Sequence, residues 1–98
     1  MTRKDLVSKF IHHGATKGRV SSVSVGFFNG YRALFSYDTL IAVWVGDTLV
    51  CNRSVYSRTT SSLQNMVRRE CPTRMYRSVQ EVNMGAAIAV TSDEQGGV

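Results

Sequence analysis

The sequence lacks the features that would assign it to a membrane or to a known reaction. No apolar run approaches the ~18 residues that span a bilayer. The first fourteen residues, MTRKDLVSKFIHHG, lack the apolar core of a signal peptide. These absences predict a cytosolic protein with no membrane partner. No G-x-S-x-G elbow, Walker loop or paired-carboxylate signature occurs, so we expect no enzyme activity and no cofactor.

Metal-ligating residues are also scarce. The two cysteines, Cys51 and Cys71, form neither a C-x-x-C motif nor a metal-ligand spacing. We therefore favour two buried thiols in a reducing cytosol. The adjacent His12 and His13 would point about 100° apart on a helix and could not easily bind one ion together. The sequence predicts no metal site.

The size and composition are those of one globular domain. The chain has 98 residues, of which 43% are hydrophobic and 19% charged. The segment from Thr91 to Val98 is polar and contains glycine, so we expect a disordered tail there. A single α+β domain is predicted over residues 1–90.

A short amphipathic helix is predicted at the start of the chain, from Thr2 to His13. Thr2 and Asp5 resemble a capping box, with Asp in the place of Glu. Four apolar side chains recur at helical spacing and predict the buried face: Leu6, Val7, Phe10 and Ile11.

Asn29-Gly30 predicts a hairpin turn, because both residues of such a turn need positive φ. The alternating segment from Val20 to Phe28 is predicted to form one strand, and Tyr31 to Tyr37 the returning strand. A two-residue turn pairs Phe28 with Tyr31, Gly26 with Ala33, and Ser24 with Phe35. Both faces of this hairpin carry apolar groups. We expect helices or a second subunit to cover them, with an exposed aromatic platform as the alternative.

Two further strands are predicted after the hairpin. The dense apolar run from Leu40 to Val45 is typical of a central strand. Gly46-Asp47 forms a second two-residue turn, after which Thr48 to Arg53 returns. The expected sheet is therefore an antiparallel meander of three to four strands.

The second half of the chain predicts one or two helices. Ser61 to Gln64 fits a capping box, and it predicts a helix from Ser61 to Cys71, with Thr59 or Thr60 as alternative caps. Ser78 to Glu81 fits another, which predicts a helix over Val79 to Val90; a strand over Ala86 to Val90 is the alternative. The predicted class is α+β: an N-terminal helix, the meander, then one or two helices.

Positive charge is concentrated in one part of the sequence. The net charge is +5, and between Arg53 and Arg77 there are six arginines and one acid, Glu70. Arginine presents a planar fork of donors that matches phosphate and carboxylate oxygens. We therefore predict an anionic partner, with nucleic acid favoured, that contacts Arg53, Arg58, Arg68, Arg69, Arg74 and Arg77.

Three hydroxyl residues around Arg58 extend this candidate site. Ser57, Thr59 and Thr60 lie where a helix is expected to begin, so backbone N–H groups and hydroxyls could bind an anion together. The alternative is that these residues only cap the helix.

Three short segments resemble a family of small proteins encoded by tailed bacteriophages: Ser36 to Ala42, Gly46 to Val50 and Tyr56 to Ser61. The shared pattern is S-Y-x-T-x-I-A, a short apolar hairpin, and Y-S-x-T-T-[ST] before a helix. That helix often carries Lys-His where this chain has Ser62-Leu63, so no role of the histidine carries over. The resemblance covers residues 36–69. It implies a phage origin and the host cytoplasm, and it implies no reaction.

The sequence thus predicts a non-enzymatic phage accessory protein that binds nucleic acid or another anionic partner. The alternative is a protein-interaction module that inhibits a host or anti-phage defence factor. An apolar sheet face could supply that interface, or could join two copies of the chain in a homo-oligomer.

Overall fold

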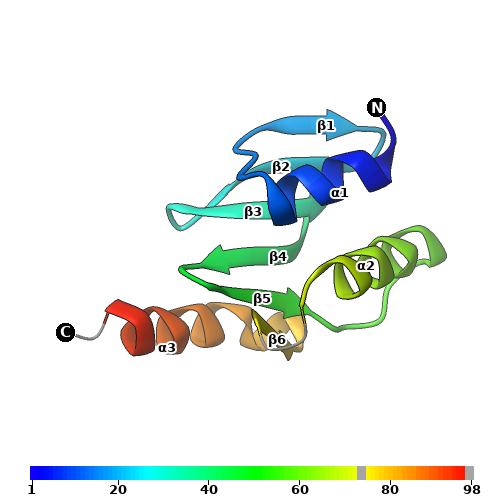
Figure 1. Cartoon of the computed structure of the whole chain (residues 1–98). Coiled ribbons are helices and arrows are strands. Elements are labelled where there is room, and N and C mark those ends of the chain that lie inside the picture. Colours follow the sequence, from blue (N-terminus) through cyan, green and yellow to red (C-terminus); the bar gives the residue numbers. More distant parts are fainter. Residues whose placement is uncertain (73–74, 97–98) are drawn as a thin grey trace.

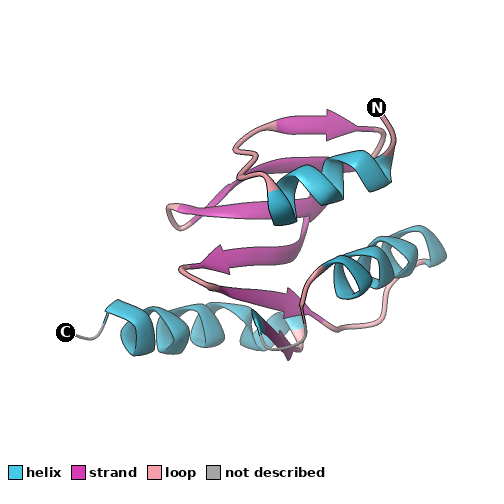
Figure 2. Cartoon of the chain, in the orientation of Figure 1, coloured by secondary structure: helices cyan, strands magenta, loops and turns pink. Residues whose placement is uncertain are grey.

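The computed structural model describes residues 1–72 and 75–96, and it shows a six-stranded sheet between layers of helices (Figures 1 and 2). The strands lie in the sheet in sequence order. The four neighbouring pairs from β1 to β5 are antiparallel, and β6 lies parallel to β5. The elements are α1 (Arg3–His12), β1 (Gly18–Val20), β2 (Val23–Phe28), β3 (Tyr31–Ser36), β4 (Thr39–Val45), β5 (Thr48–Asn52), α2 (Arg58–Glu70), β6 (Tyr76–Val79), the 3₁₀ turn η2 (Glu81–Asn83) and α3 (Met84–Gly96). The predicted α+β class is confirmed, with more strands than the three to four expected.

Helix α1 begins with the predicted capping box. The backbone N–H of Asp5 donates to the Thr2 hydroxyl at 3.1 Å, and the Thr2 N–H donates to the Asp5 carboxylate at 2.9 Å. At the other end, the Phe10 carbonyl accepts from Arg32 Nη1 and Trp44 Nε1, each at 3.1 Å. Carbonyls in the last turn of a helix have no partner within it, so these two side chains tie α1 to the sheet.

The hairpin around Asn29-Gly30 has the predicted register. Asn29 and Gly30 have φ of 52° and 85°, and Phe28, Gly26 and Ser24 pair with Tyr31, Ala33 and Phe35. The prediction of one strand from Val20 to Phe28 was wrong, because the chain reverses at Ser21, whose φ is 55°. Val20 pairs with Val23 across that turn, which makes β1 and β2 two antiparallel strands.

An irregularity in β4 gives that strand an extra residue on one face. Leu34 pairs with Ala42 and Phe35 with Leu40, so Ile41 has no partner in β3. Ile41 and Ala42 both pack into the same core cluster. A bulge of this kind bends the strand locally and increases its twist.

Apolar clusters lie on both faces of the sheet and helices pack against each, although Phe27 and Tyr37 of the predicted hairpin are exposed. One cluster joins α1 and α2 to the sheet through residues such as Phe10, Leu34 and Leu63. The other joins α3 to the sheet through Val43, Val50, Met84 and Ile88. Both predicted thiols, those of Cys51 and Cys71, are buried and free, and burial raises their pKa.

The end of the chain differs most from expectation. Ser78 does not cap a helix but lies in β6, paired with Cys51. The predicted helix over residues 79–90 instead begins at Met84, after η2, and it runs through Gly96. The segment 91–98 was expected to be a disordered tail, but it is helical over 91–96, where Thr91 is buried; residues 97–98 lie outside the described residues. Within the described residues, no helix is long and apolar enough to cross a membrane.

Replacement of Phe10 by alanine should lower the free energy of unfolding by about 3–5 kcal/mol, the usual cost of emptying a large core site. Phe10 is fully buried, whereas Phe27 is 56% exposed. Phe27→Ala is the matched control and should cost about 0.5 kcal/mol or less, as surface changes do. Chemical denaturation of both variants checks the prediction. Equal losses would contradict this account of the core.

Candidate functional site

Helix α2 begins four residues earlier than the favoured capping box suggested. Ser57 is the N-cap, and its side chain accepts from the Thr60 backbone N–H at 3.5 Å. The prediction of Ser61 as cap was wrong, and so were its alternatives, Thr59 and Thr60. Gln64 does not reach back along the helix. Its amide donates to the carbonyls of Asn52 and Ser54, at 2.8 and 3.0 Å, and so fastens α2 to the chain that leads into it.

A buried amide organises that connecting chain. Asn52 is 3% exposed, and its Nδ2 donates to the Leu40 carbonyl and to the Tyr56 hydroxyl, both at 2.8 Å. Its Oδ1 accepts from the Ser54 N–H at 2.9 Å. The Tyr56 hydroxyl donates in turn to Glu81 at 2.6 Å, and burial, followed by this bond, raises the pKa of Tyr56. Polar groups buried in this way are costly unless all are paired, so the network holds the segment in one conformation.

The three hydroxyl residues of the candidate anion site differ in their surroundings. Thr60 is 5% exposed, and its hydroxyl lies 3.0 Å from that of Ser36 in a buried hydrogen bond. It is therefore not placed to bind a surface ligand. Ser57 is exposed but is engaged as the cap, and Thr59 is exposed on the first turn of α2. The structural alternative, capping and packing, accounts for Ser57 and Thr60.

The predicted arginines do not form one patch. Arg53 is exposed just after β5, and Arg58 is exposed at the start of α2. Arg68 and Arg69 are exposed in its last turn, about 15 Å along the helix axis from Arg58. Arg74 lies outside the described residues.

Arg77 belongs to the opposite face of the sheet. It is the register partner of Val50, which packs in the α3 cluster. Its guanidinium donates to the Thr91 hydroxyl at 2.7 Å and to Glu94 at 2.8 Å, both on α3. Arg77 is thus already paired with an acid, which removes it from the predicted cluster.

Helix α1 supplies basic residues that the sequence analysis did not connect with α2. Lys4 of α1 lines a groove of about 220 Å³ together with Met66, Arg69 and Glu70 of α2. His12 Nε2 lies 3.1 Å from Glu70 Oε2 at the same junction. The signal that could have revealed this was the amphipathic pattern of α1, since its basic residues occupy the face away from the core.

The helices on the two faces of the sheet carry net charges of opposite sign. Over their described lengths, α1 and α2 carry six Lys and Arg residues against two acids, a formal balance of +4. Helix α3, on the other face, has Asp93 and Glu94 and no Lys or Arg, a balance of −2. Both acids of the first layer are engaged locally, Asp5 in the capping box and Glu70 beside His12. We call this α1/α2 layer the basic layer.

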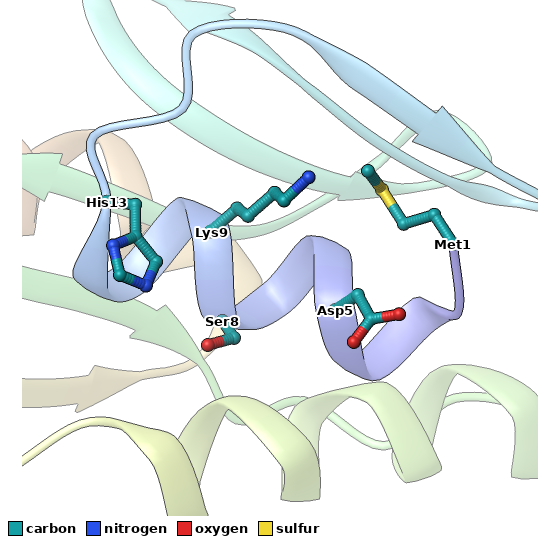
Figure 3. Close-up of a pocket in the computed structure, with 5 residues that line it drawn as sticks. All are labelled: Met1, Asp5, Ser8, Lys9 and His13. Atoms are coloured by element: carbon teal, nitrogen blue, oxygen red, sulfur yellow. The ribbon is translucent and has the colours of Figure 1, made fainter.

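A shallow hollow of about 330 Å³ lies on the other side of α1. It is lined by Met1, Asp5, Ser8, Lys9 and His13, which Figure 3 shows spread along the helix rather than converging on one point. Among the residues that the structure describes, no three side chains of His, Cys, Asp and Glu come together as a metal site would require.

A family model, described as a family of unknown function, DUF8033, matches residues 10–79. The chain belongs to this family. No curated protein and no solved structure matches the chain. The DUF8033 region includes all six strands and α2, and it leaves out most of α1 and all of α3.

The segments that resemble phage proteins fall inside the DUF8033 region. Several of their residues have structural roles there. Ser36 bonds to Thr60, Tyr56 joins Asn52 to Glu81, and Ser57 caps α2. The exposed residues of the same segments include Tyr37 and Thr59. Because Ser36, Tyr56 and Ser57 are engaged in these bonds, a ligand would meet Tyr37 and Thr59 instead.

Arg77→Gln should raise the pKa of Glu94 toward its usual value. The hydrogen bond from Arg77 and its charge lower that pKa in the folded protein. A carboxyl with a lowered folded pKa contributes stability above its unfolded pKa, and that contribution is lost as the pH falls through the folded pKa. NMR titration of the carboxyl carbons checks this. Asp5, whose pKa is lowered by its bonds to Thr2, is the internal control and should not change. An unchanged Glu94 would contradict the pairing.

Proposed function

We propose that the protein is a non-enzymatic accessory protein of a tailed bacteriophage that binds nucleic acid in the host cytoplasm through its basic layer. The observation that carries this proposal is the charge separation across the sheet, +4 on α1 and α2 against −2 on α3. The phage origin is supported by the resemblance over residues 36–69 alone.

Charge separation matters because affinity for nucleic acid comes largely from counterion release. Each phosphate that a Lys or Arg neutralises frees condensed cations, so several cations on one surface act together. A protein with the same net charge spread evenly over its surface would bring few cations to any one contact with a duplex, and would bind it weakly. On this protein the acidic residues of α3 lie behind the sheet, away from a polyanion bound to α1 and α2.

The last turn of α2 is the part of the basic layer that we expect to contribute most. Arg68 and Arg69 are consecutive and exposed, and Lys4 of α1 lines the same groove as Arg69. Three cations from two helices can therefore contact neighbouring phosphates. Two other arginines predicted from the sequence to contact the anion, Arg58 and Arg53, extend this surface toward the start of α2.

The double variant Arg68→Gln/Arg69→Gln should bind short duplex and single-stranded DNA more weakly and with less salt dependence. Loss of two phosphate contacts should reduce the slope of log K against log salt by about 2. Fluorescence anisotropy across salt concentrations measures both quantities. The double variant Arg68→Lys/Arg69→Lys, which keeps the charge, should retain the slope.

A second control removes a cation from the other face. Arg77→Gln lowers the net charge by one, as Arg68→Gln does, but it should leave the salt slope unaltered, because Arg77 is paired with Glu94. Absence of binding at low salt would contradict the proposal. So would an equal effect of Arg77→Gln and of a single Arg68→Gln replacement, since the position of the charge would then not matter.

A further inference from the structure

A polar hollow lies where the β1–β2 turn and the β3–β4 turn meet. It has a volume of about 350 Å³ and is lined by Arg19, Ser22, Ser24, Tyr37 and Asp38. Arg19 and Ser24 are register partners, and so are Ser24 and Phe35. Directly opposed residues share a face, so the hollow lies beside Phe35, on the sheet face away from α1. The basic layer is on the other side of the sheet.

Tyr37 occupies an unusual position in this hollow. Its φ is 55°, in the left-handed region that Asn or Gly adopts more easily than a residue with a bulky side chain. Its backbone N–H donates to the Ser22 carbonyl at 2.7 Å, which holds the β3–β4 turn against the β1–β2 turn. The side chain is nevertheless 69% exposed, so the ring contributes little to the core. The turn would form more easily with Asn or Gly at this position. Neither the turn nor the core therefore explains an aromatic residue here.

The side chains around Tyr37 have the chemistry that an unpaired nucleotide requires. An exposed aromatic ring can stack on any of the bases, because every base has a flat π-face. The Arg19 guanidinium matches a phosphate, and the Asp38 carboxylate accepts from an exocyclic amine or a ribose hydroxyl. The hydroxyls of Ser22 and Ser24 can donate or accept. Together Arg19 and Asp38 carry no net charge, which suits one nucleotide better than a bare anion.

The hollow is also connected to the basic layer through the β3–β4 turn. Ser36, which precedes Tyr37, shares its hydrogen bond with Thr60 in the first turn of α2. Arg58 and Thr59, both exposed, lie in that same turn of the helix. A strand that leaves the hollow past Tyr37 therefore meets cationic and hydroxyl groups of α2.

We propose that this hollow binds one unpaired nucleotide of a single-stranded nucleic acid whose phosphates continue onto α2. The proposal rests on the proposed function and names its substrate class. In a duplex the bases are paired and stacked on one another, so their faces are not accessible to Tyr37. The protein should therefore prefer single strands.

The test is anisotropy with a labelled oligodeoxyadenylate and with a duplex of the same length, for the full chain and three variants. Tyr37→Asn removes the ring and suits the left-handed backbone, Tyr37→Phe keeps the ring, and Arg19→Gln removes the cation. Loss of one stacked base should weaken single-strand binding about 5- to 100-fold. Tyr37→Phe should bind within about twofold of the parent chain, as stacking needs only the ring.

Duplex binding discriminates stacking from a change in the fold. Tyr37→Asn should leave duplex affinity unchanged, and thermal melting should show that it remains folded. Equal losses for single strand and duplex, or no loss for either, would overturn the proposal. In the second case a reduced salt slope for Arg68→Gln/Arg69→Gln would still support the basic layer, so the two failures are distinguishable.

A free nucleotide is the other source of the same chemistry. Thermal shift with adenosine monophosphate should give a small rise in melting temperature that Tyr37→Asn abolishes, while the oligonucleotide gives a larger one. A rise of equal size in Tyr37→Asn would place the nucleotide elsewhere and would contradict the assignment.

Discussion

The buried amide of Asn52 is the contact on which the rest of the arrangement depends. It joins the Leu40 carbonyl in β4 to Tyr56 and Ser54 in the chain that leaves β5. The backbone carbonyl of Asn52 accepts from the Gln64 side chain, which fastens α2 at the same point. Both donors of the amide and its oxygen are thereby paired. Because β6 is parallel to β5, the chain must cross over between them, and this network sets where the crossover helix α2 begins.

Placement of α2 determines how charge is distributed. Leu63 and Val67 face the cluster that α1 shares, so the arginines of α2 join the basic residues of α1 on one side of the sheet. The crossover then delivers β6 to the sheet edge, after which α3 packs on the other face and carries the acids there. Arg77, which lies on that face, is paired with Glu94. The sequential cluster of arginines is thus divided by the sheet.

Local features of the fold could be predicted, whereas features that depend on distant contacts could not. The Thr2–Asp5 capping box and the Asn29-Gly30 turn involve neighbouring residues, and both were right. Ser61 fitted a capping box and was favoured over Ser57, but Gln64 bonds instead to Asn52, twelve residues earlier, and Ser57 is the cap. Thr60 was expected at the surface, and only its bond to Ser36 explains its burial. The arginines of α2 could be named from the sequence, but the sequence could not reveal that α1 lies beside them.

The central claim is that nucleic acid binds the basic layer and the turn at Tyr37-Asp38 and does not contact α3. NMR mapping of backbone amides during titration with a short single strand at low salt tests it most directly. The account predicts shifts concentrated in α1, α2 and the turn at Tyr37-Asp38, with α3 unaffected. Shifts centred on Asp93 and Glu94, or none at any position, would contradict it.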